Sequence, residues 1–157
     1  MRAIIRVIAS GLYVGYSPVA PGAMGSLLGV LIYFFLYKHP HILIFVTICL
    51  FVIGFLVSAK AEKVFNEKDS GKIVIDEIAS MCLVCLFLKP GWFMLILGFL
   101  LFRFFDVAKP PPIRKVEKLS GSLGIMLDDI IAAVYTIIIL FIVYLLSEAG
   151  IFPRFYV

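Results

Sequence analysis

Two long runs without a charged residue constrain this chain more than any other feature of its sequence. Residues 42–59 and residues 130–147 contain no Asp, Glu, Lys or Arg. Each run is close to the roughly 20 residues that a helix needs to cross about 30 Å of hydrocarbon. Because 63% of the 157 residues are hydrophobic, the chain has too few polar residues for an ordinary soluble surface. The sequence therefore predicts an integral membrane protein with a single domain over residues 1–157.

Three further apolar segments are shorter than a full crossing. They cover residues 24–37, residues 73–88 and residues 92–105; the second contains two acids and the third an arginine. Each could be tilted, partly buried inside the protein, or re-entrant. A tight turn at residues 89–91 joins the last two. Counting all the segments predicts an all-α fold, a polytopic membrane helical bundle with about five membrane segments.

The distribution of basic residues predicts how these segments are oriented. If all five cross, all but three of the 14 Lys and Arg residues lie on the side of the N-terminus; the exceptions are Lys38, Lys89 and Arg154. Cytoplasmic loops carry an excess of Lys and Arg, so this side is expected to face the cytoplasm. The N-terminal MRAIIRVIAS is too short in its apolar part for a removable signal peptide, and we expect it to lie flat at the interface. If residues 24–37 are re-entrant, the N-terminus changes sides.

Five acidic residues form three sites that are distant in the sequence, namely Asp76 with Glu77, Asp106, and Asp128 with Asp129. All three sites fall at the cytoplasmic ends of the expected segments, whether or not residues 24–37 cross. An Asp can cap a helix N-terminus, but one cap needs only one side chain. Clustered carboxylates repel one another unless a cation or proton intervenes, and oxygen ligands without His or Cys suit Mg²⁺. The sequence therefore predicts a metal site at the level of a lipid head group.

Basic residues near the acids favour a phosphate ligand. Arg103 and Lys109 each lie three positions from Asp106, so they can share a helix face with it. An internal stripe of salt bridges is the alternative explanation. Gly22, Gly25 and Ser26 stand at the end of a loop rich in Gly, Pro and Ser, just before the first apolar segment, and free backbone N–H groups at a helix N-terminus could hold an anion there. This last signal is weak, because Gly and Ser are common at any helix start.

Other kinds of chemistry find little support. His39 and His41 fall on the opposite side of the membrane from the acids in this topology, which disfavours histidine-dependent phosphatase chemistry. Cys82 and Cys85 form a CxxC pair, but without further ligands nearby they are expected to be packing residues. We expect no nucleic-acid partner.

Four segments of the chain resemble the signature blocks of the phosphatidylglycerophosphatase A family. They are SPVAPGAMGS (17–26), DSGKIVIDEIASM (69–81), FRFFDVAKPPPI (102–113) and GSLGIMLDD (121–129). Their order along the chain makes the resemblance specific, whereas any one block alone would not. Three positions, Ala23, Ser80 and Ser122, depart from the Thr, Gly and Gly that the family often has there. None of these departures removes a charged group.

The resemblance implies a Mg²⁺-dependent phosphatase of the bacterial inner membrane. Such an enzyme hydrolyses phosphatidylglycerophosphate to phosphatidylglycerol and inorganic phosphate in glycerophospholipid biosynthesis, and its substrate is a phospholipid in the membrane. Carried over by position, the family's acidic residues match Asp76, Glu77, Asp106, Asp128 and Asp129, and its basic residues match Arg103 and Lys109. The fold that the family implies is helical.

On this basis we expect the five acids to include the catalytic groups and the ligands of one or two Mg²⁺ ions on the cytoplasmic side. Arg103 and Lys109, with Gly25 and Ser26, would bind the substrate phosphate. The nucleophile would be a water molecule, with an Asp phosphoenzyme as the alternative. Another membrane Mg²⁺-dependent phosphotransferase is disfavoured, because the chain lacks an Asp-Gly-x-x-Ala-Arg signature. A small carboxylate-lined cation transporter would instead place acids near the midplane and on both sides.

Overall fold

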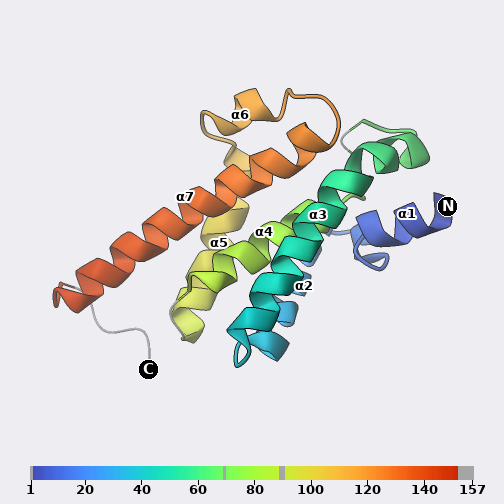
Figure 1. Cartoon of the computed structure of the whole chain (residues 1–157). Helices are drawn as coiled ribbons and strands as arrows, with labels where there is room; N and C mark the ends of the chain where they lie inside the picture. Colours follow the sequence, from blue (N-terminus) through green and yellow to red (C-terminus); the bar gives the residue numbers. More distant parts are fainter. Residues whose placement is uncertain (1, 69, 89–90, 152–157) are drawn as a thin grey trace.

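The computed structural model describes residues 2–68, 70–88 and 91–151, and within these ranges the chain is helical with no strand (Figure 1). The all-α prediction is therefore confirmed for the part of the chain that is described. The helices, in chain order, are α1 (Arg2–Ala9), the short 3-10 helix η1 (Val14–Tyr16), α2 (Pro21–Leu36), α3 (Pro40–Phe65), α4 (Ile75–Leu86), α5 (Trp92–Ala108), α6 (Ile113–Val116) and α7 (Ser122–Glu148).

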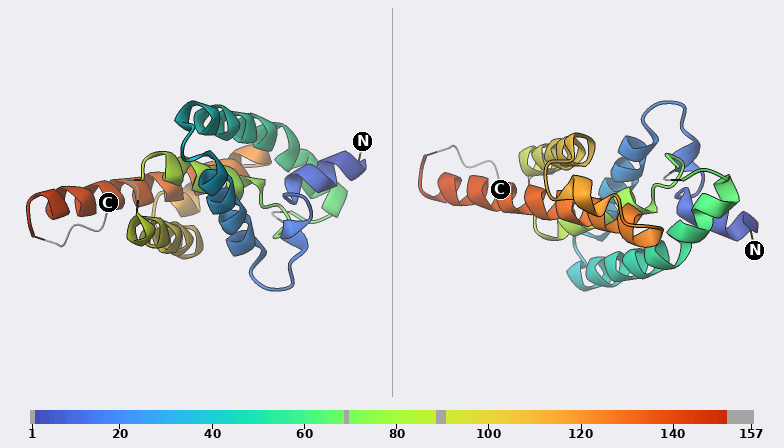
Figure 2. Two further views of the ribbon diagram at one scale, coloured as in Figure 1. Left: turned by 90° about the horizontal axis from the view of Figure 1, so that it is seen from below. Right: turned by 90° about the horizontal axis from the view of Figure 1, so that it is seen from above.

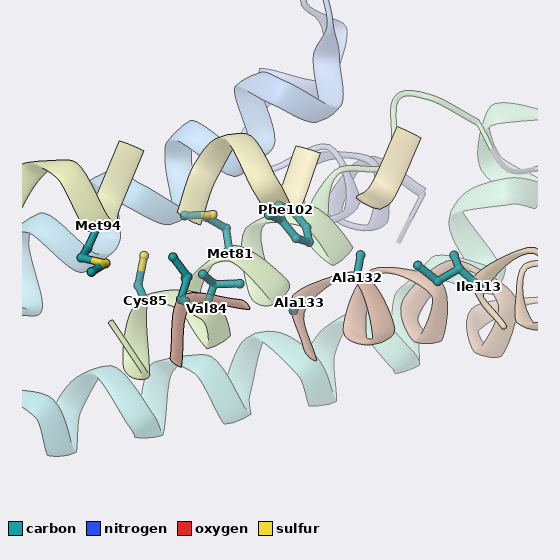
Figure 3. Packing of buried hydrophobic residues seen from close by; sticks show 9 residues of the cluster. Met81, Val84, Cys85, Met94, Phe102, Ile113, Ala132 and Ala133 are labelled. Carbon is teal, nitrogen blue, oxygen red and sulfur yellow. The ribbon is translucent and has the colours of Figure 1, made fainter. Parts of the chain in front are cut away.

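Helix α4 is the central element of the bundle. It packs against α2, α3, α5 and α7, and most of its 12 residues are buried. Apolar side chains of α4, α5 and α7 fill the space between these helices (Figure 3). The fully buried members include Met81, Phe102 and Ala133. Because α4 is enclosed on all sides, the acids in its first turn are held inside the protein rather than at its outer surface.

The helices run alternately in opposite directions. In Figure 1 the end of α3, the short α6 and the start of α7 lie toward the top, whereas the α2–α3 connection, the start of α5 and the end of α7 lie lower. Figure 2 shows the bundle from below and from above, where the last turns of α7 extend beyond the other helices. This alternation brings the starts of α4 and α7 and the end of α5 to one end of the bundle, which we call the acidic end.

Two helices, α3 and α7, are long and apolar enough to cross a membrane. Only 22% and 28% of their most apolar windows are buried, so most of this apolar surface points outward. Large outward apolar surfaces are rare on soluble monomers and mark contact with a membrane or another protein, which agrees with the membrane protein that the sequence predicts. The other expected segments form helices of 16, 12 and 17 residues, which correspond to about 24, 18 and 26 Å. The structure therefore identifies two candidate spans rather than five.

Several expected boundaries need correction. Helix α2 begins at Pro21 and not at residue 24, since Pro is well suited to the first helical position. Helix α4 covers a shorter stretch than the expected 73–88, because residues 73 and 74 lie between the preceding turn and the helix, and the helix ends at Leu86. Helix α7 begins at Ser122, well before the acids that were expected to open it. Of the expected tight turn, Lys89 and Pro90 lie outside the described residues, as does Arg154.

Candidate active site

The first turn of α4 carries Asp76 and Glu77. Val74 precedes the helix, and its backbone N–H donates to the carbonyl oxygen of Ala9 at 2.9 Å, which ties the start of α4 to the end of α1. No side chain caps the helix. The unsatisfied N–H groups of a first turn favour negative charge, so the position suits both acids. Asp76 is only 8% exposed.

Asp128 and Asp129 lie inside α7 rather than at its start. The residue that precedes the helix is Gly121, whose positive φ of 66° turns the chain into α7. The interpretation of either Asp as a helix cap is therefore wrong, because the helix begins well before them. Both side chains are buried, and Asp129 is 2% exposed. Their charges have to be satisfied within the protein.

Three of the acids converge on one point. Asp76, Glu77 and Asp129 each offer a carboxylate oxygen, and these oxygens all lie within 4.8 Å of one another. One oxygen of each residue is buried without a hydrogen-bond partner, namely Oδ1 of Asp76, Oε2 of Glu77 and Oδ2 of Asp129. Buried carboxylate oxygens without partners are costly and mutually repulsive. This carboxylate trio has the hard oxygen donors that Mg²⁺ prefers, so the residues present fit such an ion.

Arg103 pairs with the acid one turn later on α5. Its Nη1 lies 2.8 Å from Oδ2 of Asp106 and 3.9 Å from Oε1 of Glu77. The same nitrogen donates to Oγ of Ser26 at 3.4 Å. The helix-face pairing of Arg103 with Asp106 that the spacing predicts is therefore present. Because Arg103 also reaches Glu77, it connects Asp106 to the carboxylate trio.

Lys109 pairs with different acids from the one that its spacing predicts. Lys109 follows the last residue of α5 and has a left-handed backbone conformation with φ of 43°. Its Nζ lies 2.9 Å from Oδ2 of Asp128 and 2.7 Å from Oε1 of Glu117. Burial by itself lowers the pKa of Lys109, but the hydrogen bonds to Glu117 and Asp128 outweigh this effect and raise the pKa above its usual value. Lys109 therefore carries its charge into the site.

The ion pairs separate the five acids into two groups. Arg103 neutralises Asp106, and Lys109 neutralises Asp128. The acids that remain without a strong basic partner are the members of the carboxylate trio. The structure thus brings all five predicted acids and both predicted basic residues together at the acidic end, and it distinguishes a group of acids without a strong basic partner from a salt-bridged group.

The glycine and serine of α2 reach the site in a different way from the one expected. Gly25 and Ser26 lie inside the helix, where the N–H of Met24 already bonds to the carbonyl oxygen of Ala20, so the expected free amides at these positions are wrong. Ser26 instead approaches Arg103 through its hydroxyl group. The backbone of Gly22 lies directly against the site, since a Cβ there would collide with Oε1 of Glu77 and lie 3.0 Å from Nη2 of Arg103.

Glu117 is a site residue that the sequence analysis missed. It follows α6 in the basic loop IRKVEKLSGS, where a single acid among Arg and Lys gives no sign of a special role. Its side chain is 37% exposed, against 22% for Lys109 and 9% for Asp128. Glu117 therefore contacts Lys109 from the outer side, while Asp128 contacts it from within.

Comparisons with known proteins show which family the chain resembles. The sequence profile of the phosphatidylglycerophosphatase A family matches residues 7–144. A phosphatidylglycerophosphatase A of Haemophilus influenzae is 37% identical over 142 residues, which cover 87% of this chain and 86% of the relative. The Escherichia coli protein of the same name is 34% identical over 141 residues, covering 88% and 82%.

A third relative, from Bacteroides thetaiotaomicron, carries the provisional name phosphatidylinositol-3-phosphatase and is 34% identical over 143 residues, covering 85% of this chain and 89% of the relative. No solved structure gives a significant match. The family match spans most of the chain and contains all five acids and both basic residues of the site. It confirms the resemblance carried by the four sequence blocks, and this chain therefore belongs to the phosphatidylglycerophosphatase A family of phosphoric monoester hydrolases.

Proposed function

We propose that this protein is a Mg²⁺-dependent lipid phosphatase that hydrolyses phosphatidylglycerophosphate to phosphatidylglycerol and inorganic phosphate in bacterial glycerophospholipid biosynthesis. The observation that supports it most directly is the carboxylate trio, with three buried unpaired oxygens beside two basic residues. The substrate is taken from the names of the Haemophilus influenzae and Escherichia coli relatives. In this proposal Asp76, Glu77 and Asp129 hold the cation.

The basic residues would bind the phosphate while they remain paired with their acids. Arg103 has five N–H donors, and only Nη1 makes the contacts described above, so further donors remain for phosphate oxygens. Lys109 uses two of its three N–H donors on Glu117 and Asp128. When bound, Mg²⁺ would supply positive charge that neutralises the phosphate and makes a water molecule more acidic. A carboxylate of the site would accept the proton from the attacking water.

The nucleophile can be tested directly. Attack by water leaves no covalent intermediate, whereas attack by Asp forms an acyl phosphate on the enzyme. We expect that rapid acid quenching of the enzyme with substrate labelled in the terminal phosphate traps no label on the protein. Label retained at low pH and lost after hydroxylamine treatment would show that an Asp is the nucleophile.

We propose further that α2, α3, α4, α5 and α7 are the five membrane segments of a multi-pass inner-membrane protein, with the acidic end facing the cytoplasm. The alternating helix directions and the excess of basic residues at this end support the orientation. A cysteine introduced at the exposed Lys118 should react with an impermeant thiol reagent only in inverted vesicles, and one introduced at the exposed Lys38 only in right-side-out vesicles. The reverse pattern would contradict the orientation.

The activity itself is tested by release of phosphate from phosphatidylglycerophosphate in detergent. We expect release in the presence of Mg²⁺ and none after addition of EDTA, and we expect Asp76→Asn and Asp129→Asn to lower it strongly at the Mg²⁺ concentration that suffices for the wild type. The Bacteroides thetaiotaomicron relative makes phosphatidylinositol 3-phosphate a second candidate substrate, so both lipids should be compared at equal surface concentration. Absence of metal-dependent release from phosphatidylglycerophosphate would refute the proposal, and faster release from the inositol lipid would replace its substrate.

A further inference from the structure

Glu117 has no role in the proposed function, yet it makes the shortest ion pair of the site. Its Oε1 lies 2.7 Å from Nζ of Lys109, a distance typical of a charge-assisted hydrogen bond. Lys109 is also 2.9 Å from Asp128, so one ammonium group joins a partly exposed acid to a buried one. The three residues come from different elements, namely the end of α5, the loop after α6, and α7.

The backbone that carries Glu117 is fixed against α7. A Cβ on Gly124 would collide with the carbonyl oxygen of Leu119 and lie 3.0 Å from that of Glu117, so these carbonyls rest directly on the helix surface. The N–H of Glu117 donates to the carbonyl oxygen of Ile113 at 3.0 Å, and Ile113 is fully buried in the core. Glu117 is therefore held in place by its backbone as well as by its ion pair.

A lysine beside an unneutralised acidic cluster needs such an anchor. The negative charge of the three unpaired carboxylates attracts the flexible Lys109 side chain and competes with its contact to Asp128. Asp128 alone leaves Lys109 free to rotate about one contact. A second acid on the opposite side of the ammonium group fixes its position and leaves one N–H donor unused.

We infer that Glu117 is a positioning residue that holds Lys109 on Asp128, outside the carboxylate trio, so that the remaining N–H of Lys109 is available to a phosphate oxygen. Glu117 itself touches neither the phosphate nor the cation. The identity of the ligand as a phosphate rests on the proposed function, whereas the geometry of the three residues does not.

A double-mutant cycle tests the inference. Inorganic phosphate, the expected product, is titrated into the detergent-solubilised full-length protein in the presence of Mg²⁺, and binding is followed by calorimetry. We expect Glu117→Gln to weaken phosphate binding about 3- to 10-fold, the usual effect of losing one partly exposed contact to a charged group. In the Lys109→Met background the same change should have no further effect, because Glu117 acts only through Lys109.

Two controls exclude simpler explanations. Glu67→Gln removes the same charge from an exposed residue whose contact is with Ser70 rather than Lys109, and it should bind phosphate as the wild type does. Glu117→Asp keeps the charge and should recover part of the loss. The KM for lipid substrate should rise in Glu117→Gln by a larger factor than kcat falls.

Three results would overturn the inference. They are unchanged phosphate binding in Glu117→Gln, an equal loss from that change with and without Lys109, or an equal loss in Glu67→Gln. Failure of the wild-type protein to release phosphate from phosphatidylglycerophosphate would instead refute the proposed function. The two failures are therefore distinguished by the wild-type activity.

Discussion

Replacement of Gly22 by Ala tests whether close contact between α2 and the site is required for activity. The new methyl group would collide with Oε1 of Glu77 and would lie 3.0 and 3.1 Å from the two terminal nitrogens of Arg103, where ordinary contacts are 3.4–4 Å. These atoms are the ends of flexible side chains, so they can move away while the backbone stays in place. The substitution should therefore disturb the site more than the fold.

The size of the effect follows from the displacement that is needed. Relief of the collision requires Oε1 of Glu77 to move by roughly 1 Å and the terminal nitrogens of Arg103 by a few tenths of an ångström. A misplacement of about 1 Å in a reacting group can cost on the order of 100-fold in rate. We therefore expect kcat/KM to fall by about 100-fold, which corresponds to about 2.7 kcal/mol of transition-state stabilisation. Ala is favoured over Gly inside a helix by about 1 kcal/mol, which offsets part of any strain on folding.

The assay measures kcat/KM for phosphatidylglycerophosphate in detergent together with the thermal unfolding midpoint. Gly71→Ala is the matched control, because no atom lies within 4 Å of a Cβ at that position. Its activity and stability should equal those of the wild type. The reasoning is refuted if Gly22→Ala keeps wild-type kcat/KM, or if its activity falls only because the protein unfolds.

Three further predictions concern the metal, the phosphate contacts and the core. Asp129→Asn should raise the Mg²⁺ concentration needed for half-maximal activity at least about 10-fold. Asp128→Asn should mainly raise the KM for lipid, because Asp128 pairs with Lys109. If both variants need the same Mg²⁺ concentration for half-maximal activity, the division of the acids into two groups is contradicted. Arg103→Lys should lower kcat/KM about 10-fold or more with little change in unfolding temperature, because Lys lacks the planar guanidinium group that binds phosphate through two N–H groups. Wild-type kinetics in this variant would show that Arg103 does not bind the phosphate. Phe102→Ala should destabilise the protein by about 3–5 kcal/mol in denaturant unfolding, because Phe102 is fully buried, whereas the 62% exposed Phe104→Ala should cost much less.

The sequence predicted the elements that depend on composition and order. The uncharged runs marked α3 and α7, and the four blocks identified the acids and bases that the structure brings together. Hydrophobic runs reveal helices because lipid contact and burial both require apolar side chains. They do not reveal the start of a helix that carries its own charges, which explains why Asp128 and Asp129 were expected at the head of α7 rather than inside it.

The contacts that could not be predicted depend on packing in three dimensions. The pairing of Lys109 with Glu117 requires a left-handed residue at the end of α5 and a loop that returns over α7, and neither is encoded by local spacing. The contact of Gly22 with Glu77 is equally hidden, since a glycine gives the same signal whether it faces a carboxylate or lipid. The sequence identified the five acids, the two basic residues and the pair of Arg103 with Asp106, but not Glu117 or the acids that pair with Lys109.

The division of the acids also imposes an order on binding. Three carboxylates remain without a strong basic partner, and under the proposed function the phosphate would enter beside them. A phosphomonoester carries close to two negative charges at neutral pH, so it is repelled from this point for as long as the trio is unneutralised. Under the proposed function, the cation would therefore bind first and the lipid second. Excess substrate would then not compensate for a shortage of divalent cation.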